Sequence, residues 1–127
     1  MNIAFRTDAS LEIGTGHVMR CLTLAHALRD AGMYCKFITR AHPGNMAERI
    51  ATEGFEVLVL PAPAGPLTLG TPAHANWAGV DWTQDAAETR AVLADATDWL
   101  IMDHYAFDAR WQRAVLPTGT RLMVKLW

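Results

Sequence analysis

Residues 5–20 read FRTDASLEIGTGHVMR, and the other predicted elements are arranged around this segment. It predicts the end of a first strand, a polar loop that contains glycine, and the first turn of a helix. Asp8 follows the strand directly. Gly14 and Gly16 allow the backbone to turn tightly and to approach a ligand closely. A loop of this kind between a strand and a helix is typical of ligand sites in α/β proteins.

The helix that follows this loop begins with two chemically useful side chains. His17 and Arg20 are three residues apart, so they share one face of the helix near its start. A helix N-terminus after a strand favours anionic or polyhydroxylated ligands. The same position favours the neutral imidazole of His17, which is the form that a general base needs. The alternative is that His17 only caps backbone groups at the start of the helix.

Apolar runs and helical periodicity alternate along most of the chain. The expected strands cover residues 2–6, 34–39, 55–60, 98–103 and 121–125. The expected helices cover residues 18–28, 46–53 and 83–96, and a last one lies between Asp108, its cap, and Pro117. The apolar run at 55–60 is typical of a parallel sheet with both faces covered. The sequence therefore predicts one α/β domain over residues 1–127, a Rossmann-like parallel sheet flanked by helices.

Residues 61–82 interrupt this alternation with a long loop rich in proline and glycine. The segment holds four prolines and three glycines, and it ends with Trp77 and Trp82. A connection this long inside a compact domain is uncommon and is usually functional or disordered. The two tryptophans could stack on a sugar or a base, or they could pack the loop onto the sheet.

A second polar group, Asp103-His104-Tyr105, ends the fourth expected strand. The carboxyl ends of parallel strands share the edge of the sheet where ligands bind, so this group is expected beside the loop that contains Asp8. The sequence therefore predicts Asp103, His104 and Tyr105 as ligand-binding residues. The alternative is that Asp103 caps a turn and Tyr105 packs on the surface.

Two other kinds of site have weaker support. The segment GTGHVM at residues 14–19 resembles a dinucleotide fingerprint, but Met19 replaces the third glycine. The second strand ends in Arg40 and not in an acid, which would suit NADP better than NAD. A metal site can be drawn from four residues without the spacing of a zinc motif: Asp8, His17, Asp103 and His104. Neither a metal nor a cofactor is predicted.

The remaining reactive and aromatic side chains are expected in ordinary structural positions. The histidines expected to be solvated are His26, on the exposed side of the first helix, and His42 and His74, in loops. The tryptophans expected in the core or an interface are Trp99 and Trp111. The thiol of Cys21 lies on the apolar face of the first helix, where we expect an inert core residue.

The composition excludes several classes of function. The 127 residues carry 11 basic and 13 acidic side chains in a mixed order, for a net charge of −2, which indicates no nucleic-acid footprint and no basic membrane patch. The first apolar run is too short for a signal peptide, and no run is long enough to cross a bilayer. Cys21 and Cys35 form no CxxC pair. A cytoplasmic location is expected.

Two segments resemble a known family. FRTDASLEIGTGHVMRCLTLAHAL at residues 5–28 closely resembles the opening of the hydrolases that cleave UDP-2,4-diacetamido-2,4,6-trideoxy-β-L-altropyranose in pseudaminic acid biosynthesis. Related spore-coat polysaccharide biosynthesis proteins share this signature, which is the long pattern R-x-D-x-S-x-x-I-G-x-G-H-x-x-R. DWLIMDHYAFDARW at residues 98–111 resembles a second segment of the family.

The resemblance implies the N-terminal half of a GT-B-like two-domain fold that works without a metal. His17 matches the histidine proposed to activate water for attack on the anomeric carbon, and Asp8 matches an aspartate that orients His17 or the sugar. The substrate is expected to be a UDP-linked amino sugar. The residues expected to bind it are Gly14, Gly16, Arg20, Asp103, His104 and Tyr105.

The resemblance also implies a C-terminal nucleotide-binding domain that this chain lacks, because the chain stops after the fifth expected strand. We therefore expect the isolated chain to fold but to turn over little or no substrate. Measurable UDP release by these 127 residues would contradict this expectation. The face left by the missing domain could support a homodimer.

Two alternatives to a UDP-sugar hydrolase remain open at the level of the sequence. The first is the N-terminal domain of a GT-B glycosyltransferase, in which the same histidine deprotonates a sugar hydroxyl. The second is a non-catalytic nucleotide-binding module.

Overall fold

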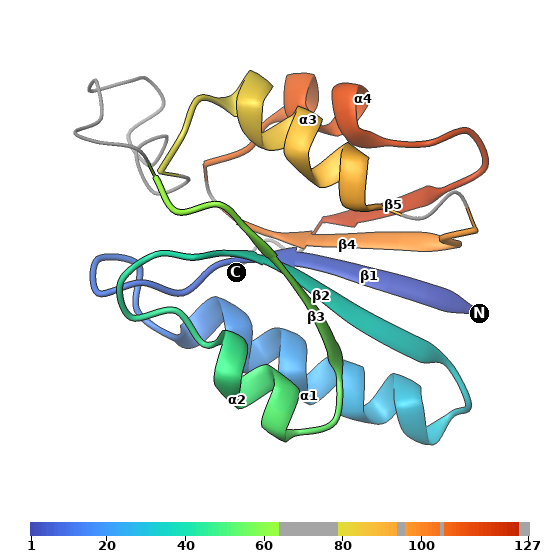
Figure 1. Cartoon of the computed structure of the whole chain (residues 1–127). Helices are drawn as coiled ribbons and strands as arrows, with labels where there is room; N and C mark the ends of the chain where they lie inside the picture. The colour runs from blue at the N-terminus through green and yellow to red at the C-terminus, as the bar shows by residue number, and fades with distance from the viewer. Residues whose placement is uncertain (64–78, 94–95, 105, 125–127) are drawn as a thin grey trace.

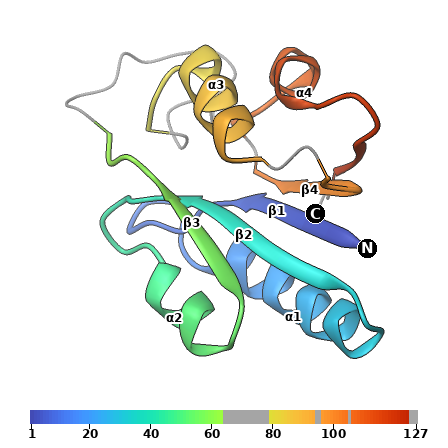
Figure 2. The same cartoon turned by 45° about the vertical axis from the view of Figure 1, so that its right-hand side comes forward.

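Five parallel strands form one sheet, with two helices on each face, in the part of the chain that the structure describes (Figure 1). The computed structural model describes residues 1–63, 79–93, 96–104 and 106–124. The strand order is β3-β2-β1-β4-β5, so β1 lies in the centre of the sheet. Figure 2 shows α1 and α2 on one face and α3 and α4 on the other. The predicted α/β fold with a Rossmann-like parallel sheet is confirmed.

The helices and strands follow the predicted order. The strands are β1 (Asn2–Thr7), β2 (Tyr34–Arg40), β3 (Glu56–Leu60), β4 (Trp99–Asp103) and β5 (Arg121–Val124). The helices are α1 (Gly16–Asp30), α2 (Ala47–Thr52), α3 (Trp82–Val92) and α4 (Ala109–Val115). One bound differs clearly from its prediction. α3 ends at Val92 and not near Ala96, because Leu93 takes an extended backbone conformation with φ −79° and ψ 118°.

The central strand brings the two predicted site segments together. β1 pairs with β2 on one side and with β4 on the other, and Thr7 at its carboxyl end is the register partner of Asp103. The loop from β1 to α1 therefore leaves the sheet beside the end of β4, at the left of Figure 1. This shared edge is where α/β proteins place their ligands.

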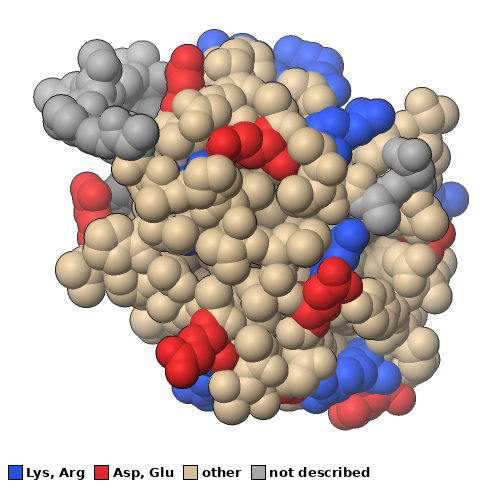
Figure 3. All heavy atoms as spheres, viewed as in Figure 1, with Lys and Arg blue, Asp and Glu red and all other residues tan. Residues whose placement is uncertain are grey.

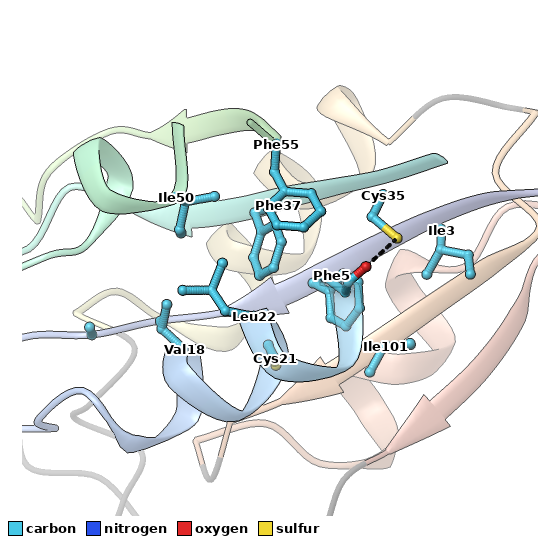
Figure 4. Packing of buried hydrophobic residues seen from close by; sticks show 12 residues of the cluster. Ile3, Phe5, Val18, Cys21, Leu22, Cys35, Phe37, Ile50, Phe55 and Ile101 are labelled. Carbon is cyan, nitrogen blue, oxygen red and sulfur yellow. Dashed lines mark hydrogen bonds between the residues drawn. The ribbon is translucent and has the colours of Figure 1, made fainter. Parts of the chain in front are cut away.

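The face under α1 and α2 holds one hydrophobic core. Phe5 of β1 and Phe37 of β2 stack with their ring centroids 4.8 Å apart, and Phe55 packs against Phe37 (Figure 4). α1 contributes buried residues at the helical spacing that the sequence predicts: Val18, Cys21, Leu22 and Ala25. Cys21 is thus a core residue, as expected. Burial of this apolar stripe fixes α1 along the sheet.

The opposite face holds a second core under α3 and α4. Phe107 stacks on Trp111 with a centroid distance of 4.6 Å, and Trp111 is fully buried. The expectation of a core position is therefore confirmed for Trp111. Trp99 is partly buried and packs against the first core.

The long loop at 61–82 is described only at its two ends. Trp77 and residues 64–78 lie outside the described ranges. Trp82 is the first residue of α3 and packs against the second core, and the guanidinium of Arg110 lies 5.0 Å from the centre of its ring. For Trp82, the structure therefore shows the packing alternative.

A buried carboxylate ties α3 to the sheet and to α4. Asp85 of α3 is fully buried and accepts hydrogen bonds from Arg6 of β1 (Nε, 3.2 Å; Nη2, 2.5 Å) and from Arg40 of β2 (Nη2, 2.8 Å). It also accepts from Trp111 Nε1 at 2.9 Å and from Thr89 Oγ1 at 3.1 Å. Burial would raise the pKa of Asp85, but the charge of Arg6 and the hydrogen bonds from Arg6 and Arg40 lower it.

The surface carries both signs of charge. Figure 3 shows acidic and basic side chains interspersed on the viewed face. No helix in the described ranges combines the length and the apolar composition that crossing a membrane requires.

We expect Asp85→Asn to lower the free energy of unfolding by about 3 kcal/mol or more, because it leaves two buried guanidinium groups short of a carboxylate. Urea unfolding followed by circular dichroism measures this loss. Asp30→Asn, at an exposed position on α1, is the matched control and should change stability by less than about 0.5 kcal/mol. Equal effects of the two substitutions would contradict the role of Asp85.

Candidate active site

An imidazole and a buried carboxylate meet at the carboxyl edge of the sheet. His17 lies in the first turn of α1, and Asp103 is the last residue of β4. His17 Nδ1 lies 2.5 Å from Asp103 Oδ1. The Asp103 side chain is fully buried, whereas 8% of the His17 side chain is exposed. The structure thus joins two residues that the sequence placed on different segments of the site.

This contact assigns the proton on the His17 ring. The Asp103 carboxylate accepts hydrogen bonds, so the short contact places the proton of a neutral imidazole on Nδ1. Nε2 then carries the lone pair that can accept a proton. An imidazole held by a buried carboxylate through Nδ1 is the arrangement of a general base in catalytic triads.

Arg20 adds positive charge to the same pair. Its Nη2 atom lies 3.5 Å from Asp103 Oδ1 and 3.3 Å from His17 Nδ1. The side chain is 32% exposed, so the guanidinium reaches from the buried carboxylate toward the surface. The predicted pairing of His17 and Arg20 on one helix face is therefore confirmed.

Asp103 has two further polar neighbours. The Cys21 thiol donates to Asp103 Oδ2 with the sulfur 3.8 Å away. The core position of Cys21 was predicted, but this contact was not. The hydroxyl of Thr7, whose strand position faces Asp103 across the ladder, is buried without a hydrogen-bond partner among the described residues.

The loop before α1 needs one of its two glycines for its shape. Gly14 has φ +81° and donates its N–H to Ser10 O at 2.8 Å, so a side chain there would be strained. Gly16 does not have a positive φ angle, and a Cβ atom there would lie at an ordinary 3.5 Å from Arg20 Nη1.

The first turn of α1 contains no acidic side chain, and Thr15 makes no capping side-chain hydrogen bond. The carboxylate beside this positive helix end therefore comes from Asp103 of β4 and not from α1 itself.

Asp8 belongs to a second cluster, with Arg6 and His104. Orienting His17 was one of its two expected roles, but the carboxylate that contacts His17 belongs to Asp103. Asp8 Oδ1 accepts from Arg6 Nη1 at 2.6 Å and from the Arg40 backbone N–H at 2.8 Å. Its Oδ2 atom accepts from His104 Nε2 at 2.9 Å. The physical reason is that Asp8 points to the face of α3, where Arg6 attracts it.

His104 is a buried, neutral residue of this second cluster. Its Nε2–H donates to Asp8, and its Nδ1 accepts from the Ala106 backbone N–H at 3.1 Å. Burial lowers the pKa of His104. Burial would raise the pKa of Asp8, but the charge of Arg6 and the hydrogen bond from His104 lower it well below its usual range. Tyr105, the third residue predicted there, lies outside the described ranges.

The expectation of solvated histidines fails for His42. This side chain is buried, and its Nε2 atom lies 3.4 Å from Asp8 Oδ2. The loop after β2 contacts the β1–α1 loop, since the Leu11 N–H donates to Pro43 O at 3.0 Å. Gly79, in the segment before α3, lies against the His42 ring, because a Cβ atom there would lie 2.6 Å from His42 Cε1. His26 is partly exposed and pairs with Glu53 Oε1 at 2.5 Å. His74 lies outside the described ranges.

Sequence reasoning missed Arg6 and Asp85 and misassigned Arg40. The Arg40 guanidinium is fully buried between Asp85 and Glu88 and donates to Pro61 O, so the NADP interpretation loses its phosphate-binding residue. A usable signal was present, because arginines at the carboxyl ends of two strands expected to be buried need carboxylate partners.

Within the described ranges, no three His, Cys, Asp or Glu side chains are grouped as metal ligands would be. The four residues from which a metal site could be drawn instead divide between the two clusters: His17 and Asp103 in one, Asp8 and His104 in the other.

We expect the free energy of unfolding to fall as the pH decreases from about 7.5 to about 5, across the usual pKa of histidine. In this window the unfolded chain protonates His104, whereas the lowered pKa of His104 in the folded chain delays this uptake to lower pH, so stability is lost. Asp8 acts in the same direction below about pH 4, where only the unfolded carboxyl takes up a proton. Urea unfolding at a series of pH values measures the effect.

His104→Gln removes the titrating group and is the comparison that isolates it from the other histidines. The variant should show a flatter dependence of stability on pH in the upper window. An unchanged slope would show that His104 does not contribute to it.

No protein-family model matches this sequence, and the search of curated proteins returned no match.

Proposed function

We propose that this chain supplies the sugar-side residues of a hydrolase that cleaves a UDP-linked diacetamido-trideoxyhexose, with His17 as the general base. The observation that carries the proposal is the 2.5 Å contact between His17 Nδ1 and the buried Asp103 Oδ1. This contact leaves the lone pair of a neutral imidazole on Nε2. The motif R-x-D-x-S-x-x-I-G-x-G-H-x-x-R, in which His17 occupies the histidine position, supports the same assignment.

The proposed reaction is a single displacement at the anomeric carbon. Nε2 of His17 takes a proton from water as the water oxygen forms a bond to this carbon. The bond between the anomeric carbon and the phosphate oxygen breaks, and UDP leaves with the electron pair. The products are UDP and the free amino sugar. The Asp103 carboxylate stabilises the imidazolium that forms, because it already accepts the Nδ1–H.

Positive charge beside the base suits a leaving group of this kind. The Arg20 guanidinium is partly exposed, and the first turn of α1 carries no acidic side chain. Both features favour the negative charge that develops on a departing diphosphate. The buried carboxylate of Asp103 keeps Arg20 near the base by a charge-assisted contact.

We expect His17→Ala to lower kcat for UDP release by about 100- to 10,000-fold, the range for removal of a general base. Asp103→Asn should cause a comparable loss, because an amide at this position favours the wrong tautomer of His17. The assay measures UDP release from the diacetamido-trideoxyhexose nucleotide by the complete product of the reading frame that encodes this chain. His26→Ala, at a partly exposed position on the same helix, is the matched control and should retain full activity.

Three other results of this assay would contradict part or all of the proposed function. UDP release that survives His17→Ala would remove His17 as the base. Release by the wild type only after addition of an acceptor sugar would favour glycosyl transfer. No release under either condition would contradict an enzymatic function for these substrates.

A further inference from the structure

Two hydrogen bonds act on adjacent residues at the end of β4. Asp103 contacts His17 on the face of α1, and His104 contacts Asp8 on the opposite side. A single peptide unit therefore joins the proposed base to the buried cluster around Asp8. A displacement of the backbone at His104 is therefore transmitted to Asp103, because the peptide unit between them is planar and rigid.

His104 is held firmly in its position. Both of its ring nitrogens have partners: Asp8 Oδ2 for Nε2 and the Ala106 N–H for Nδ1. Its ring also packs on Phe107 at a centroid distance of 4.4 Å, and Phe107 in turn stacks on Trp111. Because rings packed in a core leave few alternative rotamers, this set of contacts fixes the chain that follows β4.

Asp8 is a fixed partner for His104. Its Oδ1 atom accepts from the Arg6 guanidinium, the Arg40 backbone N–H and, at 3.3 Å, the Thr39 hydroxyl. These donors belong to the two central strands β1 and β2, and all are fully buried. The Asp8 carboxylate is therefore anchored to the sheet on one oxygen and to His104 on the other.

We propose that Asp8 and His104 are positioning residues, which hold the end of β4 so that the Asp103 carboxylate meets His17 Nδ1. The catalytic meaning of this arrangement rests on the proposed function, since it matters only if His17 is the base. The positions of Asp8, His104, Asp103 and His17 relative to one another can be tested in this chain without any substrate. Asp8 then orients His17, one of the two roles that the resemblance implies for it, through His104 and Asp103.

Two substitutions of His104 separate the contacts of its two nitrogens. Glutamine can place an amide N–H near the position of Nε2 and keep the bond to Asp8. Asparagine can place an oxygen near the position of Nδ1 and keep the bond to the Ala106 N–H, but it is too short to reach Asp8. Both variants carry a side-chain amide at residue 104, and only the glutamine can keep the hydrogen bond to Asp8.

The readout is the hydrogen-bonded Nδ1–H proton of His17, observed by NMR in the 127-residue chain. We expect His104→Asn to move this resonance upfield and to speed its exchange with water roughly fivefold, the factor for loss of one hydrogen bond of average strength. His104→Gln should leave the resonance near its wild-type position. A resonance that is unchanged in His104→Asn would overturn the proposal, and so would equal shifts in both variants.

A milder variant keeps the proposal testable if the His104 variants do not fold. Thr39→Val removes one of the donors to Asp8 and changes the side-chain volume little. It should shift the His17 proton in the same direction by a smaller amount, and no shift would overturn the proposal.

The NMR result is independent of the activity assay. A shift in His104→Asn combined with no UDP release by the complete protein would leave the positioning role intact and remove the proposed function. Normal UDP release that depends on His17, combined with no shift in His104→Asn, would leave the proposed function intact and remove the positioning role.

Discussion

The guanidinium of Arg6 lies fully buried between the carboxylates of Asp8 and Asp85, and its charge constrains how the surrounding elements pack. A buried charge is costly unless it is paired and hydrogen-bonded, so Arg6 requires both partners. Asp85 belongs to α3, and Asp8 begins the loop that leads to α1. Burial would lower the pKa of Arg6, but the two carboxylates raise it, and the group stays charged. One side chain of the central strand thereby fixes both a covering helix and the start of the site loop.

Two groups of polar residues lie at the carboxyl edge of the sheet, one on each face. On the face of α1, His17, Asp103 and Arg20 form a group that reaches the surface and has the chemistry of proton transfer. On the face of α3, the cluster around Asp8 and Asp85 is buried, and hydrogen bonds join Asp8 to Arg6 and His104, and Asp85 to Arg6. Among the described residues, Arg40 Nε and His42 Nε2 of this cluster are buried without a hydrogen-bond partner. The peptide unit between Asp103 and His104 connects the two groups. A rigid buried network beside a partly exposed pair is a suitable support for a base, because catalysis requires the base to be held in place before substrate binds.

Much of the fold follows from local patterns in the chain. The apolar runs predicted the strands. The helical spacing of four apolar residues predicted the buried face of α1: Val18, Cys21, Leu22 and Ala25. Asp108 caps α4 as expected and accepts a hydrogen bond from the Arg110 N–H at 2.9 Å. Placing Asp103 beside the β1–α1 loop required only the rule that parallel strands end at one edge. α3 shows the limit of such reasoning, because helical periodicity continues to Ala96 although the backbone leaves the helix at Leu93.

Local patterns in the chain were enough to predict the α/β fold, the edge of the sheet that carries the candidate site, and most of the residues at that edge. The pairing among these residues follows from the packing of the folded chain: Asp103 with His17, Asp8 with His104, and Arg6 with Asp85. These partners are 86, 96 and 79 residues apart, and no local pattern reports such a separation. The burial of His42 also depends on a distant segment, since Gly79 lies against its ring. The physical reason is that a carboxylate pairs with whichever donor the packing of the helices against the sheet brings within hydrogen-bond distance.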